Sequence, residues 1–281
     1  MQLTHFSKKQ VADSFSKYAP TYEEHAFLQK EIAYRLLEHS TLLKMKPLRV
    51  LDLGCGTGIL HDLIKKHYPT AEIVELDIAW GMVSRCAKNK KTWSFLKKKQ
   101  IIQGDMEHLP FKNQSFDIVF SNCALQWSTD LSLLFKETER ILQPKGAFFF
   151  ATFGPDTLKE VNALWQHVDN YPHVHTFLDM HPIGDLLLQV GFHDPVMDQE
   201  FLQVQYQSIE KLFSDLKCTG ARNLNPNRNK GLTTPKKFHM LKKTFQRVLE
   251  SNKNFSCTYE VLYGHALKTN IKQIPTHCLQ L

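Results

Sequence analysis

A short turn that contains three glycines, Gly54, Gly56 and Gly58, follows an apolar segment at 48–53. Glycines leave the backbone bare, so a ligand can approach the chain and the beginning of the next helix closely. A dinucleotide-binding turn has the spacing Gly-x-Gly-x-x-Gly and holds a pyrophosphate, whereas the third glycine comes one residue earlier here. Asp52 would repel a pyrophosphate but would attract the ammonium group of a bound amino acid. The turn therefore predicts a site for a ligand with an amino acid moiety.

Two further carboxylates come at the ends of the next two apolar segments. Asp77 closes the segment 72–77, and a carboxylate at the carboxyl edge of a sheet can accept hydrogen bonds from both hydroxyls of a ribose. Asp105 closes the third segment and can accept from an adenine amino group, with Ile78 and Met106 against the faces of the ring. Together with the glycine turn, these acids predict a ligand built from adenosine and an amino acid.

Elements of regular structure must bring these residues to one edge. Strand-like segments alternate with segments of helical spacing; the strands lie at 48–53, 72–77, 99–103, 116–121 and, after a turn at 144–146, at 146–152, and the helices at 59–66, 80–89 and 130–142. This alternation predicts an α/β fold with a doubly wound, mostly parallel sheet and helices on both faces. A helix near 181–190 and strands near 195–206 and 257–268 would complete a sheet of seven strands.

The flanking segments have a different pattern from this core. We expect the following divisions: an N-terminal helical lid at 1–45, the α/β core at 46–207, a basic helical cap at 208–254, the last core strand at 255–268 and a disordered tail at 269–281. Between Lys217 and Arg247 the cap has nine basic residues and no acidic residue. A segment of one sign attracts an anionic partner, although a solvated helix face or a nucleic acid partner also fits the charge.

The composition of the 281 residues, with 42% apolar and 22% charged residues, is that of a globular protein. No apolar run approaches the roughly 20 residues that cross a bilayer, and no secretory signal begins the chain, so we expect a cytoplasmic protein without membrane insertion. The six cysteines form no Cys-x-x-Cys pair, so reduced thiols are expected. His173, His175 and His181 with Asp179 resemble a metal-ligand set, but ordinary loop histidines fit better and we predict no metal.

Several segments resemble class I S-adenosylmethionine-dependent methyltransferases. Residues 50–58 match the first motif of that superfamily, and 104–111, 116–122 and 142–146 match later motifs. A narrower resemblance covers almost the whole chain and is to the malonyl-[acyl-carrier protein] O-methyltransferases of biotin synthesis. The segments that carry it are 22–29, 153–158, 177–185, 195–198, 216–232 and 259–266.

This resemblance implies a cofactor, a reaction and a partner. Such an enzyme transfers a methyl group from S-adenosylmethionine to the free carboxylate of a malonyl thioester. A carboxylate with a reference pKa of about 4 is already a nucleophile at neutral pH, so no general base is required. The malonyl group is carried by an acidic acyl carrier protein, which we expect to dock on the basic cap at 217–247, with no nucleic acid partner.

Side chains for the substrate and for covering the cofactor are also expected. The cap residues Arg222 and Arg228 have forked donors that suit the substrate carboxylate. Tyr18 and Tyr22 of the N-terminal helix are expected to cover the cofactor near the sulfonium, with Tyr22 beside the reacting groups. Asn122, Gln126 and Trp127, which follow the fourth strand, are expected where substrate would meet cofactor, although packing of that edge also fits them.

Two other functions fit parts of the pattern. One is a methyltransferase for a quinone precursor or another small molecule, whose substrate would not need a basic docking face. The other is an assembly factor for a respiratory complex that hydroxylates an arginine, because a cofactor-binding fold can persist without methyl transfer. Methyl transfer to malonyl carrier protein distinguishes the three functions.

Overall fold

The computed structural model describes residues 6–89, 100–220, 223–225, 227–229 and 231–269. The predicted tail at 269–281 therefore lies almost entirely outside the described residues, and so does Arg222. No helix in the described part of the chain is both long enough and apolar enough to cross a membrane. Cysteines at 55, 86, 123, 218 and 257 are free thiols, while Cys278 falls outside the described ranges.

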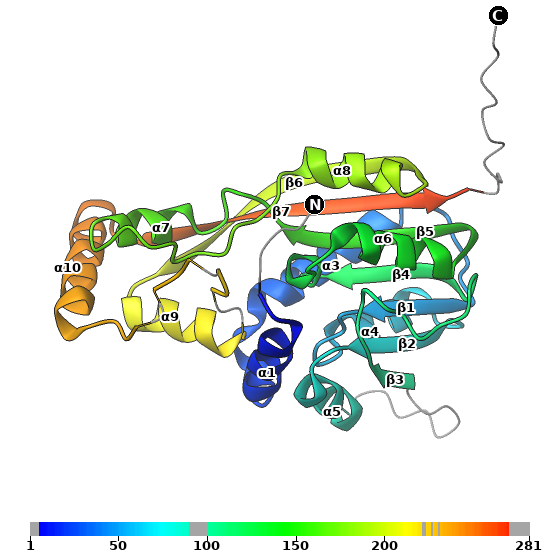
Figure 1. Ribbon diagram of the computed structural model, residues 1–281, viewed down its shortest axis with the longest axis horizontal. Helices are drawn as coiled ribbons and strands as arrows, with labels where there is room; N and C mark the ends of the chain where they lie inside the picture. Colours follow the sequence, from blue (N-terminus) through cyan, green and yellow to red (C-terminus); the bar gives the residue numbers. More distant parts are fainter. Residues whose placement is uncertain (1–5, 90–99, 221–222, 226, 230, 270–281) are drawn as a thin grey trace, which may run out of the picture.

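A seven-stranded sheet with the order β3-β2-β1-β4-β5-β7-β6 forms the centre of the molecule (Figure 1). Neighbouring strands are parallel from β3 to β5, and β7 runs antiparallel between β5 and β6. The strands are β1 (Arg49–Leu53), β2 (Glu72–Asp77), β3 (Gln100–Gln103), β4 (Phe116–Asn122), β5 (Leu142–Phe153), β6 (Phe192–Tyr206) and β7 (Phe255–Lys268). The predicted doubly wound, mostly parallel sheet is confirmed.

Helices cover both faces of the sheet, because its central strands are apolar on both sides. They are α1 (Lys8–Tyr18), α2 (Tyr22–His25), α3 (Phe27–Ser40), α4 (Ile59–His67), α5 (Trp80–Lys88), the 3₁₀ turn η1 (Leu125–Trp127), α6 (Leu131–Ile141), α7 (Lys159–Gln166), α8 (Met180–Gln189), α9 (Ile209–Cys218) and α10 (Pro235–Asn252). In β5, the buried rings of Phe148 and Phe150 pack with α6 and α8, and the buried ring of Phe149 belongs to the core of the opposite face.

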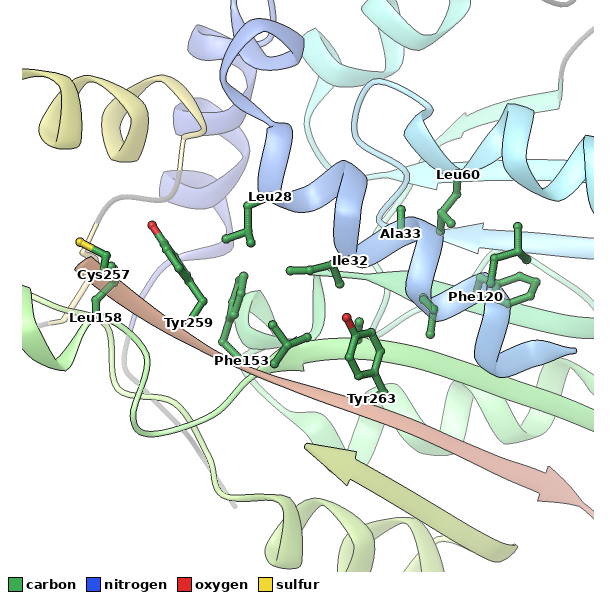
Figure 2. Close-up of a cluster of buried hydrophobic side chains, with 14 of the residues drawn as sticks. Leu28, Ile32, Ala33, Leu60, Phe120, Phe153, Leu158, Cys257, Tyr259 and Tyr263 are labelled. Atoms are coloured by element: carbon green, nitrogen blue, oxygen red, sulfur yellow. The ribbon is translucent and has the colours of Figure 1, made fainter. Parts of the chain in front are cut away.

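The core of that opposite face holds side chains of α3, α4, α7, α9 and α10. Figure 2 shows Leu28 and Ile32 of α3 next to Phe153, Tyr259 and Tyr263 from the sheet. The strands β6 and β7 extend past the parallel part of the sheet, and α7, α9 and α10 lie at that extended end (Figure 1). The segment between β6 and β7, predicted to be a cap, therefore packs on the same apolar face as α3.

The N-terminal helix α1 lies against α5, close to the carboxyl edge of the sheet (Figure 1). The backbone N–H of Gly81 in α5 donates to Ser16 Oγ at 3.1 Å. A Cβ added at Gly81 would lie 2.5 Å from the carbonyl oxygen of Ser16, so the two helices approach each other without room for a side chain. This contact places α1 beside the glycine turn.

Three local expectations were wrong or incomplete. Helix α7 was not predicted, because the apolar pattern loosens after residue 153. The strand β5 begins at Leu142, so the expected turn at 144–146 lies inside this strand. The pairing of β5 with β4 shifts its register there, between Phe116 and Ile118 of β4, and Lys145 has a φ of 66°. Asp105 does not close β3, which ends at Gln103, but lies in the loop that follows.

Candidate functional site

The glycine turn after β1 has a backbone conformation that glycine adopts at little cost. Gly54, Gly56 and Gly58 have φ angles of 77°, 56° and 87°, in the left-handed region. The N–H of Gly54 donates to the carbonyl oxygen of Leu76 at 2.8 Å, which ties the turn to β2. A Cβ added at Gly54 would lie 2.4 Å from the Cβ of Ala124, so a side chain has no room there. Bare backbone is thus held close to the loop that follows β4.

Asp77, the last residue of β2, holds the turn from the other side. Its Oδ2 accepts from the Gly56 N–H at 2.9 Å, and its Oδ1 accepts from the Ala79 N–H at 2.8 Å. Burial raises the pKa of this carboxyl, and backbone hydrogen bonds from Ala79, Gly56 and Ile78 act against that rise. Each carboxylate oxygen has a second lone pair, so Asp77 keeps acceptor capacity for two ribose hydroxyls.

A cavity opens beside the turn, and we call it the cofactor cavity. Its lining includes these residues predicted from the sequence: Tyr22, Gly54, Gly56, Asp77, Ile78, Met106 and Asn122. Trp127, which was expected where substrate would meet cofactor, also lines it. The lining further contains residues that the sequence analysis did not single out as site residues: Val11, Phe15, Leu76, Met82, Gly104, Cys123 and Ala124. An apolar pocket with a carboxylate at its wall is suited to adenosine, because apolar side chains would cover the ring and Asp77 would accept from the ribose hydroxyls.

The spacing of Val11 and Phe15 carries a signal for two of the missed residues. They lie four residues apart and therefore on one face of α1, which is the face that lines the cofactor cavity. The sequence gives the helical spacing, but which element the apolar face of α1 covers depends on its packing against α5.

Four predicted cofactor residues lie outside the lining of this cavity. Asp52 and Tyr18 are buried, with 1% and 8% of their surface exposed. Gly58 forms the N-cap of α4 in the left-handed conformation. Asp105 is partly exposed beyond the end of β3. The roles assigned to these four residues in cofactor binding stay predictions.

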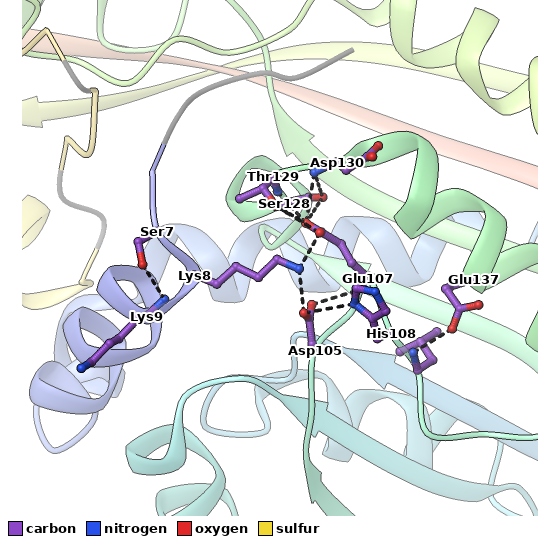
Figure 3. A network of polar contacts seen from close by, with 11 residues as sticks. Ser7, Lys8, Lys9, Asp105, Glu107, His108, Ser128, Thr129, Asp130 and Glu137 are labelled. Carbon is purple, nitrogen blue, oxygen red and sulfur yellow. Dashed lines mark hydrogen bonds and ion pairs between the residues drawn. The ribbon is translucent and has the colours of Figure 1, made fainter.

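Asp105 takes part in an ion-pair network that joins α1 to the loop after β3 (Figure 3). Lys8 Nζ lies 2.6 Å from Asp105 Oδ2 and 2.5 Å from Glu107 Oε2. Glu107 is buried and also accepts hydrogen bonds from the hydroxyls and backbone N–H groups of the turn at 128–130. Burial by itself would raise the pKa of Glu107, but the hydrogen bonds from Lys8 and this turn hold it below its ordinary value.

A second, larger cavity of about 390 Å³ lies next to the cofactor cavity. Its lining is mainly aromatic and aliphatic and includes Phe27, Leu28, Phe153, Leu158, Val161, Trp165, Phe177, Phe213 and Tyr259. The two cavities share Trp127. Asn122 of the cofactor cavity donates from Nδ2 to the carbonyl oxygen of Gln29, a residue of the second cavity, at 3.0 Å. We infer that an acceptor substrate in the second cavity would meet the cofactor near Asn122 and Trp127.

The histidines that resembled a metal-ligand set are dispersed. His173 Nε2 lies 2.7 Å from Asp169 Oδ1, and its ring stacks on that of Trp165 at 3.7 Å. His175 packs among aromatic rings, and His181 is exposed beside Asp179. Within the described ranges, no group of three or more His, Cys, Asp or Glu side chains is arranged to hold a metal ion.

Asp169 connects this histidine to the cap. Lys237 of α10 reaches its carboxylate at 2.7 Å. Burial by itself would raise the pKa of Asp169, but hydrogen bonds from Lys237, from His173 and from the Tyr171 N–H lower it to about 2. The carboxylate therefore helps to hold α10 against the segment after α7.

The structure places Arg228 outside the linings of both cavities. Its Nη1 donates to the carbonyl oxygen of Asn225 at 3.2 Å. Arg222 lies outside the described residues. Binding of the substrate carboxylate by either arginine stays a prediction.

Comparison with known proteins adds a family to this geometry. Residues 51–150 match a family model described as a methyltransferase domain. The chain is 39% identical over 259 residues to the malonyl-[acyl-carrier protein] O-methyltransferase of Legionella pneumophila, covering 92% of this chain and 90% of that protein. The YcgJ protein of Bacillus subtilis shares the fold, with a TM-score of 0.58 and 18% identity over 84% of this chain and 99% of that chain.

A second solved structure, with a bound cofactor product, has the same fold. It is phosphoethanolamine N-methyltransferase 2 of Haemonchus contortus in complex with phosphomonomethylethanolamine and S-adenosylhomocysteine, with a TM-score of 0.55 and 16% identity over 90% of this chain and 57% of that chain. The glycine turn, Asp77 and the apolar cofactor cavity agree with S-adenosylmethionine as the cofactor. The chain belongs to the malonyl-[acyl-carrier protein] O-methyltransferase family of S-adenosylmethionine-dependent methyltransferases.

Proposed function

We propose that this chain transfers a methyl group from S-adenosylmethionine to the free carboxylate of malonyl-acyl carrier protein, and that the methyl ester serves biotin synthesis. The names of its relatives support the substrate, and the observation that carries the proposal is the second cavity. This cavity is mainly apolar and shares Trp127 with the cofactor cavity. A malonyl thioester needs such a chamber, because its carboxylate must be aligned with the methyl group while the thioester and tether are accommodated beside it.

The side chains near the cofactor are suited to positioning rather than to proton transfer. When bound, S-adenosylmethionine supplies a methyl group attached to a positively charged sulfur. Burial raises the pKa of Tyr22 and that of Cys123, so both side chains are protonated at neutral pH. The phenol is therefore no base and the thiol is no competing nucleophile. The substrate carboxylate reacts as the anion, and the protein has to orient it and exclude water.

Docking of the carrier protein on the basic cap forms a second part of the proposal. Lys237 and Lys242 of α10 are engaged in ion pairs of 2.7 Å with Asp169 and Glu210. Other α10 side chains are exposed and follow at helical spacing on one face; we call them the α10 stripe, which consists of Lys236, Met240, Lys243 and Arg247. Within the described ranges, no acidic side chain pairs with the cations of this stripe. Cations around an apolar side chain suit an acidic carrier protein.

Mass spectrometry of malonyl carrier protein tests the methyl transfer directly. After incubation with the chain and S-adenosylmethionine, the carrier should gain the mass of one methyl group, and ester hydrolysis should remove it. Acetyl carrier protein, which has no free carboxylate, is the matched control and should gain no mass. An unchanged mass of malonyl carrier protein, with cofactor binding intact, would refute the proposal.

The same assay distinguishes the other functions. A methyltransferase for a small molecule would methylate a quinone precursor at equal rates with and without carrier protein. An arginine hydroxylase would add oxygen to a protein side chain and leave the malonyl group unchanged. The predicted role of the cap arginines is tested by Arg222→Ala and Arg228→Ala, and unaltered turnover and KM in both variants would show that neither binds the carboxylate.

A further inference from the structure

The substrate carboxylate needs a positively charged partner inside the second cavity, because this cavity is mainly apolar. Basic side chains of the described residues that line it are His25, His173, His175 and Lys217. His173 is already engaged by Asp169 and by the ring of Trp165. Burial lowers the pKa of His175, which favours its neutral form. His25 and Lys217 remain as partners.

His25 is the last residue of α2, the helix that follows α1, whereas Lys217 lies in the last turn of α9. The short helix α2 carries Tyr22 and His25 three residues apart, so the two side chains lie on one face of it. Tyr22 lines the cofactor cavity, and His25 lines the second cavity. A group bound by His25 is therefore within about one helical turn of a residue that contacts the cofactor space.

Asp215 orients the ring of His25. Its Oδ1 lies 2.7 Å from His25 Nδ1 and also accepts from Lys211 Nζ at 2.8 Å. Only 5% of the surface of Asp215 is exposed, so this contact fixes α2 to α9 inside the protein. A protonated imidazole donates from both nitrogens, so Nε2, at the opposite edge of the ring, can donate to an anion while Nδ1 donates to Asp215.

We propose that His25, positioned by Asp215, binds the carboxylate of the acyl substrate in the second cavity, three residues from Tyr22 of the cofactor cavity. The proposal rests on the function proposed above and names the residue that recognises its substrate. One carboxylate oxygen accepts a hydrogen bond from Nε2. The other oxygen donates a lone pair to the methyl carbon as the carbon–sulfur bond breaks, and the electron pair of that bond stays on the sulfur.

This arrangement explains how substrate is distinguished from product. The substrate carries a negative charge that pairs with His25, and the methyl ester carries none. Because the surrounding wall is apolar, an ion pair within it is stronger than one in water. Methylation thus removes the contact that held the substrate, and the ester binds more weakly than the acid.

A binding experiment with small thioesters tests the proposal. Titration calorimetry would compare malonyl-N-acetylcysteamine with its methyl ester, each added to the chain in complex with S-adenosylhomocysteine. The wild-type chain should prefer the acid, and His25→Gln should weaken binding of the acid by on the order of 30-fold while binding of the ester is unaltered. His193→Gln, an exposed histidine in β6 outside both cavities, is the matched control. A His25→Gln variant that retains the preference for the acid would overturn the proposal.

Two further variants separate recognition of the carboxylate from a structural role. Asp215→Asn should weaken binding of the acid less than His25→Gln does, and His25→Lys should restore part of it because the positive charge returns. The affinity for S-adenosylhomocysteine should be unaltered in His25→Gln; a loss equal to that for the acid would show that His25 acts on the fold of the lid and would refute the proposal. A wild-type chain that binds the acid through His25 but methylates no malonyl carrier protein would refute the proposed function and leave the carboxylate site supported.

Discussion

Replacing Lys8 by methionine tests whether the network in Figure 3 closes α1 over the cofactor. Lys8→Met removes the ammonium group between Asp105 and Glu107 but keeps a side chain of similar length. Helix α1 then loses its ion pairs with the loop after β3, while Val11 and Phe15 remain available to line the cofactor cavity. The variant should bind the cofactor more weakly because the closed position of α1 is less stable.

The exposure of the three side chains gives the expected magnitude. Lys8 and Asp105 are 29% and 28% exposed, and Glu107 is 4% exposed. Exposed ion pairs contribute about 0–1 kcal/mol, and removing one partner of a buried pair costs about 3–5 kcal/mol. Glu107 keeps its hydrogen bonds from the turn at 128–130, so we expect a loss of about 1–2 kcal/mol. The dissociation constant of the cofactor should therefore rise by about 5- to 30-fold.

Titration calorimetry with S-adenosylhomocysteine measures this effect. Lys9→Met, at the exposed neighbouring position, is the matched control. Added salt should weaken cofactor binding by the wild-type chain and by Lys9→Met, but have little effect on Lys8→Met, because salt screens partly exposed ion pairs. Equal dissociation constants for Lys8→Met and Lys9→Met would refute the reasoning.

Three other predictions follow from the structure. Gly54→Ala should reduce the affinity for the cofactor at least about tenfold in calorimetry, because the new Cβ meets Ala124 and a φ of 77° is strained for alanine. Adding Ala124→Gly to the same chain should restore part of this affinity. Normal affinity in the single variant would contradict the packing. The double variant Lys236→Glu/Lys243→Glu should raise the KM for malonyl carrier protein by about tenfold and leave the KM for a small malonyl thioester unaltered. Equal effects on both substrates would exclude docking on the α10 stripe. The lowered pKa of Asp169 contributes stability that is complete above the unfolded-state pKa of about 4 and is lost as the pH falls toward 2. In urea titrations between these two pH values, Asp169→Asn should therefore lose less unfolding free energy than the wild type. Parallel losses in the two proteins would contradict the lowered pKa.

The core of the fold and the cofactor turn were predictable because their signals are local. Strands such as β1 and β5 are apolar runs bounded by turns, and their alternation with amphipathic helices restricts the topology to a parallel, doubly wound sheet. Gly54 and Asp77 could be recognised because the carboxyl ends of parallel strands meet at one edge. These features are confirmed for the fold, and the structure brings both residues into one cavity.

Other features depend on contacts between distant parts of the chain. Helix α7 and the second cavity were missed, since the cavity is formed by residues of α3, β5, α7 and α9 whose apolar spacing indicates only a core. His25 and Asp215 are 190 residues apart in the chain, and neither residue has a motif around it that indicates the contact. The division into lid, core and cap and the roles of Arg222 and Arg228 stay predictions.

The sequence by itself determined most of the elements, the mostly parallel character of the sheet and the class of cofactor, because hydrophobic periodicity and the glycine spacing are properties of neighbouring residues. Only the tertiary structure decided which side chains share a cavity. It placed Lys8 against Asp105 and Glu107, and it placed His25 against Asp215 in the wall of the second cavity. The physical reason is that such pairs form when the packing of apolar helix faces brings together polar groups whose separation along the chain carries no local pattern.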